Sequence, residues 1–175
     1  MTDYVALLRG VAPVFEGMRN ADLVGVLGRA GFEDLRTVGA SGNLLFRSDD
    51  RSRRRLERIA EDALHAHLGR PCTTIIRSRR QVERLLSRDP FAGHPDEAPS
   101  RWNVTFLQRA PRDPPPLPPP TRDGQAVSQH AGEVFLVVDT TTPGTSSLMA
   151  AVERTYGRET TTRTWRVVER IARTF

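Results

Sequence analysis

The first half of the chain alternates between short apolar runs, typical of buried strands, and longer segments whose apolar residues recur with helical spacing. The clearest helical stripe runs from Leu56 to Leu64 and extends to His67, which is therefore expected to pack in the core. The expected elements are a strand at 4–8, a helix at about 20–30, strands at 35–38 and 44–46, a helix at about 51–68 and a strand at 72–76. This β-α-β-β-α-β order is that of a ferredoxin-like unit with two helices on one sheet face.

The second half predicts another α+β subdomain, with the order α-β-β-β-α-α. Ser78 and Gln81 have the spacing of a capping box, and Ser146 is expected to cap a later helix. The expected elements are a helix to about 88, strands at 102–107, 125–128 and 134–138, a helix that ends near 157 and a helix from about 164 onward. We therefore predict an α+β protein of two ferredoxin-like subdomains, at 1–77 and 78–175.

Seven of the ten residues at 111–120 are proline, which predicts an extended segment or a loose loop between two strands. Arg112, Pro115 and Pro118 have the R-x-x-P-x-x-P spacing of a ligand for SH3 domains. In so proline-rich a run that match carries little information. A spacer with few buried contacts is the favoured interpretation.

Composition excludes several kinds of chemistry. All 26 basic residues are arginine, which excludes a P-loop lysine, a Schiff-base lysine and a lysine general base. The single cysteine, Cys72, excludes an intramolecular disulfide and opens a strand expected to be buried, unlike a reactive thiolate. The sequence has no membrane-span pattern, and Asp3 stands where a secretory leader would be basic. We expect a cytoplasmic protein with no membrane partner.

The four histidines do not predict a metal site. His65 and His67 lie about 200° apart around a helix, so they do not face one ion. His94 and His130 fall in expected loops without carboxylates at a ligand spacing. No metal and no other cofactor is expected.

The net charge of +5 gathers in two zones. Residues 47–88 hold twelve arginines and six acids, and residues 154–175 hold six arginines and two acids. Solvated helix faces in a chain that uses only arginine explain such zones, and a footprint for nucleic acid or a phosphorylated metabolite is the alternative. Composition does not separate these two interpretations.

Two segments and one strand end carry the candidate ligand contacts. Thr161, Thr162 and Arg163 precede the last expected helix, where hydroxyls, a guanidinium and helix N–H groups would form an anion pocket; a plain helix cap is the alternative. Ser41 and Asn43 belong to a turn that either only closes a hairpin or presents a hydroxyl and an amide to a ligand. Arg9 ends the first strand, at the edge to which such a sheet delivers side chains. No catalytic residue is assigned.

Seven sequence segments stand out when they are taken together: LLRG at 7–10, LGRAGFEDLRTV at 27–38, SGNLLF at 41–46, TTIIRSRRQVERLL at 73–86, DPF at 89–91, VTFL at 104–107 and TTRTW at 161–165. These segments resemble the bacterial DUF1697 family of unknown function. Their order and spacing match over nearly the whole chain. The resemblance implies a compact α+β protein of two ferredoxin-like halves, and it implies no known activity.

Three segments depart from the pattern of that family. The family continues LLRG as INVGG, where this chain has VAPVF at 11–15. Gly39 and Ala40 replace a tyrosine and a glutamine, and Thr164 and Arg166 replace the two asparagines of a TTRNWNT ending. These departures imply either a different ligand or the loss of an ancestral activity.

The leading hypothesis is a cytoplasmic protein that binds a small anionic ligand, and the sequence leaves open whether it also catalyses a reaction. One alternative is a single-stranded nucleic-acid binder, and another is a protein-interaction module without chemistry. RNA-recognition modules stack bases on exposed sheet aromatics, and here the corresponding strands offer only Tyr4 and Phe46, which disfavours the first alternative. The oligomeric state is not predicted.

Overall fold

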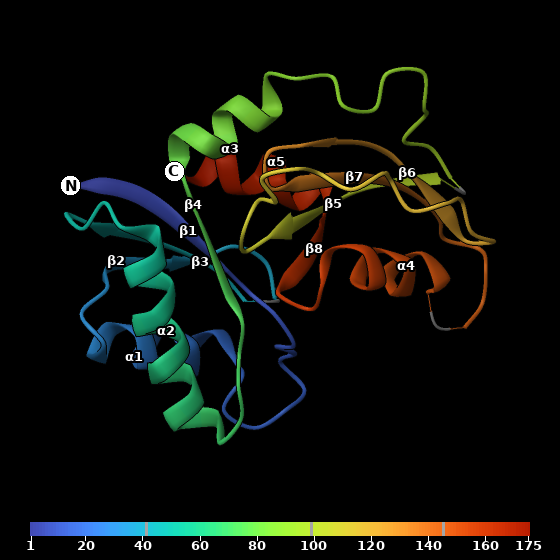
Figure 1. The fold of residues 1–175 in the computed structure, drawn as a ribbon. Helices are drawn as coiled ribbons and strands as arrows, with labels where there is room; N and C mark the ends of the chain where they lie inside the picture. Colours follow the sequence, from blue (N-terminus) through green and yellow to red (C-terminus); the bar gives the residue numbers. More distant parts are fainter. Residues whose placement is uncertain (41, 99, 145) are drawn as a thin grey trace. The chain divides into compact units, whose positions relative to one another are not determined.

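The computed structural model describes residues 1–40, 42–98, 100–144 and 146–175 (Figure 1). It divides into two compact units, the first made of 1–87 with 167–175 and the second of 88–166. The described residues of each unit form a four-stranded antiparallel sheet with helices. This confirms the predicted α+β class with two similar subdomains.

The first unit has the ferredoxin-like strand order β2-β3-β1-β4. Its elements are β1 (Thr2–Leu8), α1 (Asn20–Arg29), β2 (Glu33–Thr37), β3 (Asn43–Ser48), α2 (Arg53–Leu68), β4 (Thr74–Ser78) and α3 (Arg79–Leu86). Helices α1 and α2 lie on the same side of the sheet (Figure 1) and pack on a core that includes Tyr4, Leu44 and Phe46. Because side chains alternate along a strand, Val5 and Leu45 face the other side, where both are also buried.

Strand β4 lies at an edge of this sheet, and α2 bonds to that edge directly. The Ile76 N–H donates to Glu57 Oε1 at 3.1 Å, and the Thr74 N–H donates to Glu61 Oε1 at 2.9 Å. Four residues of helix rise about 6 Å, and two residues of strand span about 6.6 Å, so the two spacings match. The carboxylates thus satisfy strand N–H groups that no neighbouring strand meets.

We expect replacement of Glu57 by leucine to destabilise the protein by about 1–3 kcal/mol, because it leaves the Ile76 N–H buried without an acceptor. Glu57→Gln keeps an amide oxygen at the same place and should cost clearly less. Urea unfolding followed by circular dichroism measures both. Equal losses in the two variants would contradict a role for this hydrogen bond.

The second unit repeats the strand arrangement in the order β6-β7-β5-β8. Its elements are β5 (Ser100–Leu107), β6 (Gly124–His130), β7 (Glu133–Asp139), α4 (Ser147–Tyr156) and β8 (Thr160–Thr164), followed by α5 (Trp165–Thr174), which continues into the first unit. Helix α4 covers one sheet face through Leu148 and Val152 (Figure 1). Aromatic rings pack together elsewhere in the unit, where Phe91 stacks on Trp102 with ring centres 4.5 Å apart.

The segment 111–120 connects β5 to β6, the place that α1 takes between β1 and β2. Leu117 packs against the core beneath α4, Pro118 is buried, and Gln129 Nε2 donates to the Pro115 carbonyl at 2.7 Å. Six of the ten residues at 111–120 are exposed, as expected of a spacer, but Leu117 and Pro118 add buried contacts that the sequence did not predict. Two residues of the R-x-x-P-x-x-P match lie against the protein, since Pro118 is buried and Pro115 is half-buried.

Strand β8 was not expected from the apolar pattern, which gave no strand between the last two helices. It pairs antiparallel with β5, with Thr162 opposite Thr105 and Arg163 opposite Val104. The sequence TTTRT lacks apolar residues, so hydrophobic periodicity has nothing to detect. Its four β-branched threonines are the signal that favours a strand.

Asp123 fixes the start of α4. It is 4% exposed and accepts hydrogen bonds from Ser146 Oγ at 2.6 Å, Thr121 Oγ1 at 2.8 Å and the Leu148 N–H at 3.1 Å. Burial raises the pKa of Asp123, but these hydrogen bonds to its charged form outweigh burial and hold the pKa below its ordinary value. Ser146 also accepts from the Met149 N–H at 3.2 Å, as its predicted capping role requires.

A carboxyl group with a depressed pKa stabilises the fold above its unfolded-state pKa of about 3.9, and this contribution is lost as pH falls through the folded-state value. We therefore expect the difference in unfolding free energy between the wild type and Asp123→Asn to be largest near pH 6 and to shrink below about pH 4. Urea titrations over a pH series measure it. A difference that stays constant down to pH 2.5 would contradict the assignment.

Candidate functional site

Three chain segments meet at one end of the first sheet. Strand β1 ends there, and β3 and β4 begin there, because Leu7 pairs with Asn43 and Leu8 with Thr74. The Leu8 N–H donates to the Gly42 carbonyl, and the Arg9 N–H donates to the Thr73 carbonyl, both at 2.9 Å. We call this region the loop end of the first sheet. It comprises the loop 9–19, the turn between β2 and β3, and the segment 69–73.

The loop 9–19 is held by side chains that are distant in sequence. Arg70 Nη2 donates to the Gly10 carbonyl at 2.6 Å and lies 3.6 Å from Met18 Sδ. The His67 ring nitrogen lies 3.0 Å from the Gly17 carbonyl oxygen. His67 is exposed, so its expected place in the core is wrong, because the last turn of α2 meets this loop and not the sheet. Local periodicity does not detect such a contact.

The turn before β3 places Asn43 and leaves Ser41 outside the described residues. Asn43 is 2% exposed, its side-chain amide donates to the Val38 carbonyl at 2.9 Å, and its own carbonyl accepts from the Val38 N–H at 2.9 Å. Gly42 has a φ of 61°, and a Cβ there would lie 3.0 Å from the Leu8 Cβ. Asn43 therefore closes the turn, and Gly42 lets it approach β1.

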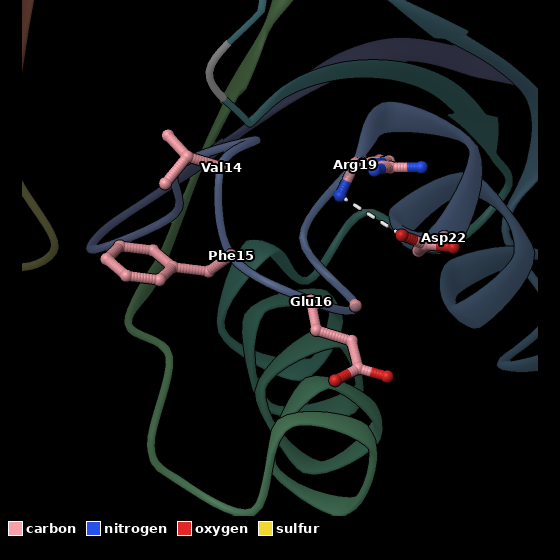
Figure 2. A pocket seen from close by; sticks show the side chains of 6 residues that line it. Val14, Phe15, Glu16, Arg19 and Asp22 are labelled. Carbon is pink, nitrogen blue, oxygen red and sulfur yellow. Dashed lines mark hydrogen bonds between the residues drawn. The ribbon is translucent and has the colours of Figure 1, made fainter.

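A pocket of about 440 Å³ opens beside the loop 9–19 (Figure 2). Its lining residues are Val14, Phe15, Glu16, Gly17, Arg19 and Asp22. An adjoining pocket of about 480 Å³ shares three of them and adds Met18, His67 and Leu68. Figure 2 shows Val14 and Phe15 turned away from Arg19 and Asp22, where the Arg19 N–H donates to Asp22 Oδ2 at 3.2 Å. Val14 is 82% exposed and Phe15 58% exposed, which is unusual for apolar side chains of this size.

These pocket residues were missed as candidates. The only sequence signal was the apolar run VAPVF at 11–15, inside a segment that predicts neither a strand nor a helix. Arg9 was predicted correctly to end β1, and it is half-buried at the loop end. Its assignment as a ligand contact stays a prediction.

Thr161, Thr162 and Arg163 belong to the second unit and precede α5 directly, as expected, but they lie in strand β8 and not in a loop at the helix start. Their backbone runs beside β5, and the side chains alternate between the two sheet faces. Arg163 Nη1 donates to Thr161 Oγ1 at 2.7 Å and to the Thr162 carbonyl at 2.8 Å, while the Thr162 hydroxyl contacts that of Thr105. Burial lowers the pKa of Arg163 to about 10. The contact of these residues with a ligand also stays a prediction.

Among residues 1–40, 42–98, 100–144 and 146–175, no three or more His, Cys, Asp and Glu side chains are grouped to hold a metal ion. In the same residues no helix has the length and apolar character needed to cross a membrane.

Comparison with known proteins identifies the family. The model of a family described as "Protein of unknown function (DUF1697)" matches residues 1–135. The chain belongs to the DUF1697 family. This membership confirms the resemblance carried by the segments from LLRG to VTFL, and it brings no activity with it. No curated protein matches this DUF1697 chain.

The solved structures that match include one that is covered along nearly its whole length. It is that of the conserved bacterial protein SP0830 from Streptococcus pneumoniae, with a TM-score of 0.69 and 18% sequence identity. The match covers 99% of this DUF1697 chain and 98% of the other chain. At this identity the likeness shows the fold alone.

Cys72 lies at the base of the loop end, where its Sγ donates to the Arg9 carbonyl at 3.4 Å. Burial raises the pKa of the Cys72 thiol to about 11, although Arg70 acts in the opposite direction. A thiol of this kind is almost entirely protonated near neutral pH and is a poor nucleophile. The surroundings of Cys72 in this DUF1697 chain therefore disfavour its thiolate form.

We expect iodoacetamide at pH 8 to alkylate Cys72 at least about 100-fold more slowly in the native protein than in guanidinium chloride, because only the thiolate reacts and burial disfavours it. Mass spectrometry gives a single readout, since the chain has one cysteine. Similar rates in both conditions would show that the loop end opens freely.

Proposed function

We propose that this DUF1697 protein binds a small anionic ligand at the loop end of the first sheet, with Arg70 as the main cationic contact. The proposal rests on the exposure and the fixed orientation of the Arg70 side chain. It is exposed, it is held by the Gly10 carbonyl and Met18, and it forms no ion pair with any described residue. A guanidinium that is already oriented loses little conformational entropy when it binds an oxyanion.

The pockets beside the loop 9–19 support a ligand of limited size. Arg70 lines neither pocket, but its Nη2 lies 3.6 Å from Sδ of Met18, which lines the second one. The two adjoining pockets have volumes of about 440 and 480 Å³, within the range of small-molecule sites. Arg19 lines the first pocket and His67 the second. Arg9 lies at the start of the same loop as Arg19, and His67 and Arg70 come from the end of α2 and the residues after it. The cationic and donor groups thus come from two separate chain segments.

Two carboxylates restrict which ligand fits. Glu16 and Asp22 line both pockets, and like charges placed beside them would be repelled. The Asp22 carboxylate accepts from the Arg19 N–H, and Figure 2 shows the Glu16 carboxylate directed away from Arg19. We therefore favour a ligand whose anionic group meets Arg70 and whose remaining part is neutral or carries hydroxyl or amino groups.

We propose binding and assign no reaction, because no general acid and base are paired among the described residues of the loop end. We place the protein in the cytoplasm, since a single buried thiol suits a reducing compartment. The base-stacking alternative has less support. Tyr4 and Phe46 are 3% and 1% exposed, and their rings lie 5.4 Å apart in the core beneath α1 and α2.

We expect phosphate and sulfate to raise the melting temperature more than chloride at matched ionic strength. A site filled to about ten times its Kd adds about 1.4 kcal/mol of stability. Arg70→Gln should lose this oxyanion-specific increment, because it removes the charge at the loop end. Arg84→Gln is the matched control, since Arg84 is also exposed, on α3 of the same unit and outside the loop end. The general stabilisation by excluded anions appears in every variant and is subtracted.

Two results of that experiment would overturn the proposal. One is an unchanged oxyanion increment in Arg70→Gln. The other is loss of the increment in Arg163→Gln alone, which would assign the anion site to the second unit.

A further inference from the structure

A row of exposed arginines runs along the outer face of α2. Arg54 and Arg58 are one turn apart, on the side opposite the buried residues Leu56, Ala60 and Leu64. Arg51 precedes the helix and is exposed as well. None of these three arginines forms an ion pair with a residue in the described part of the chain. We call Arg51, Arg54 and Arg58 the arginine ridge.

The neighbours of the ridge do not neutralise it. The Arg55 guanidinium lies 3.5 Å from the Asp50 carboxylate, so that acid serves another arginine. Asp62 follows Arg58 by one turn and is exposed, but the two do not pair in the structure. His65 continues the same face. The ridge therefore presents to solvent three guanidinium groups that form no ion pair with the described residues.

This arrangement opposes the stability of the helix itself. The first turn of α2 holds Arg53, Arg54 and Arg55 and no acid, although the positive end of the helix dipole favours acids there. Arg54 and Arg58 also repel each other as like charges at i and i+4. The helix is held by its packing and by the bonds of Glu57 and Glu61 to β4. A surface pattern that works against its own element is typical of a functional surface.

We infer that the arginine ridge binds the phosphate backbone of nucleic acid. Guanidinium groups match phosphate oxygens in geometry and charge, and an exposed helix face can follow a sugar-phosphate strand. A membrane surface fits less well, because the large exposed apolar side chains of the described residues are Met1, Val14 and Phe15, and none is on α2. Such contacts fix position without reading bases, so no sequence preference is expected.

The ridge is separate from the loop end within the first unit. Arg54 stands in the first turn of α2, and Arg70 follows its last turn, about 20 Å further along the helix axis. The inference therefore goes beyond the proposed function, and each site has its own variant.

The test measures the anisotropy of a fluorescein-labelled 20-base-pair DNA duplex over a series of salt concentrations. The Arg54→Gln/Arg58→Gln double variant should bind at least tenfold more weakly at 50 mM salt. Its slope of log K against log salt should be shallower by about 2, since two phosphate contacts are lost. Arg70→Gln should bind the duplex like the wild type. Thermal melts confirm that each variant is folded.

Several results would overturn the inference. They are absence of duplex binding at 50 mM salt, an unchanged slope in the double variant, and equal loss of binding in Arg70→Gln. Poly-glutamate is added as a competitor at equal charge. If it displaces the labelled duplex as well as unlabelled duplex does, the ridge suits acidic protein surfaces and not nucleic acid.

Discussion

The hydrogen bonds from α2 to the edge of β4 fix this helix against the first sheet. Glu57 and Glu61 meet two strand N–H groups, so they fix both the height and the direction of the helix along the strand. With that direction set, the last turn of α2 brings His67 to the loop 9–19, and the following segment brings Arg70 there. The arginines in the first turn of α2 are exposed to solvent. Both proposed surfaces thus depend on one pair of carboxylates.

The elements that sequence reasoning found are those in which apolar residues repeat. Strand β1, helix α2 and the capping box of Ser78 with Gln81 follow local rules, and each is present in the structure. Strand β8 was not predicted because its residues are polar, and it is buried through its pairing with β5. The role of Glu57 was not predicted for a related reason. A single glutamate in a helix has no recognisable sequence pattern, and its role follows only from its hydrogen bond to β4.

The candidate site was predictable only in part. Antiparallel pairing brings the end of β1 to the start of β3, so the meeting of Arg9 with the turn at Gly42 and Asn43 follows from the strand order. Arg70 and His67 contact carbonyl groups about 50–60 positions away in the chain. The spacing of residues along the sequence does not predict such contacts. The exposure of Phe15 is likewise a property of the folded loop, because the same apolar residue is equally compatible with burial.

The first unit is assembled from two separated stretches of chain, since 167–175 return to it after the whole of 88–166. Arg36 of β2 donates from Nη1 to the Thr174 carbonyl at 2.9 Å, a contact that spans 138 positions. On a ribosome that adds roughly 5–20 residues per second, the second unit is synthesised without interruption, while the first waits about 4–18 seconds for its last helical turns. During that interval the surface destined for α5 is open to chaperones, so the order of biosynthesis is opposite to the order of completion.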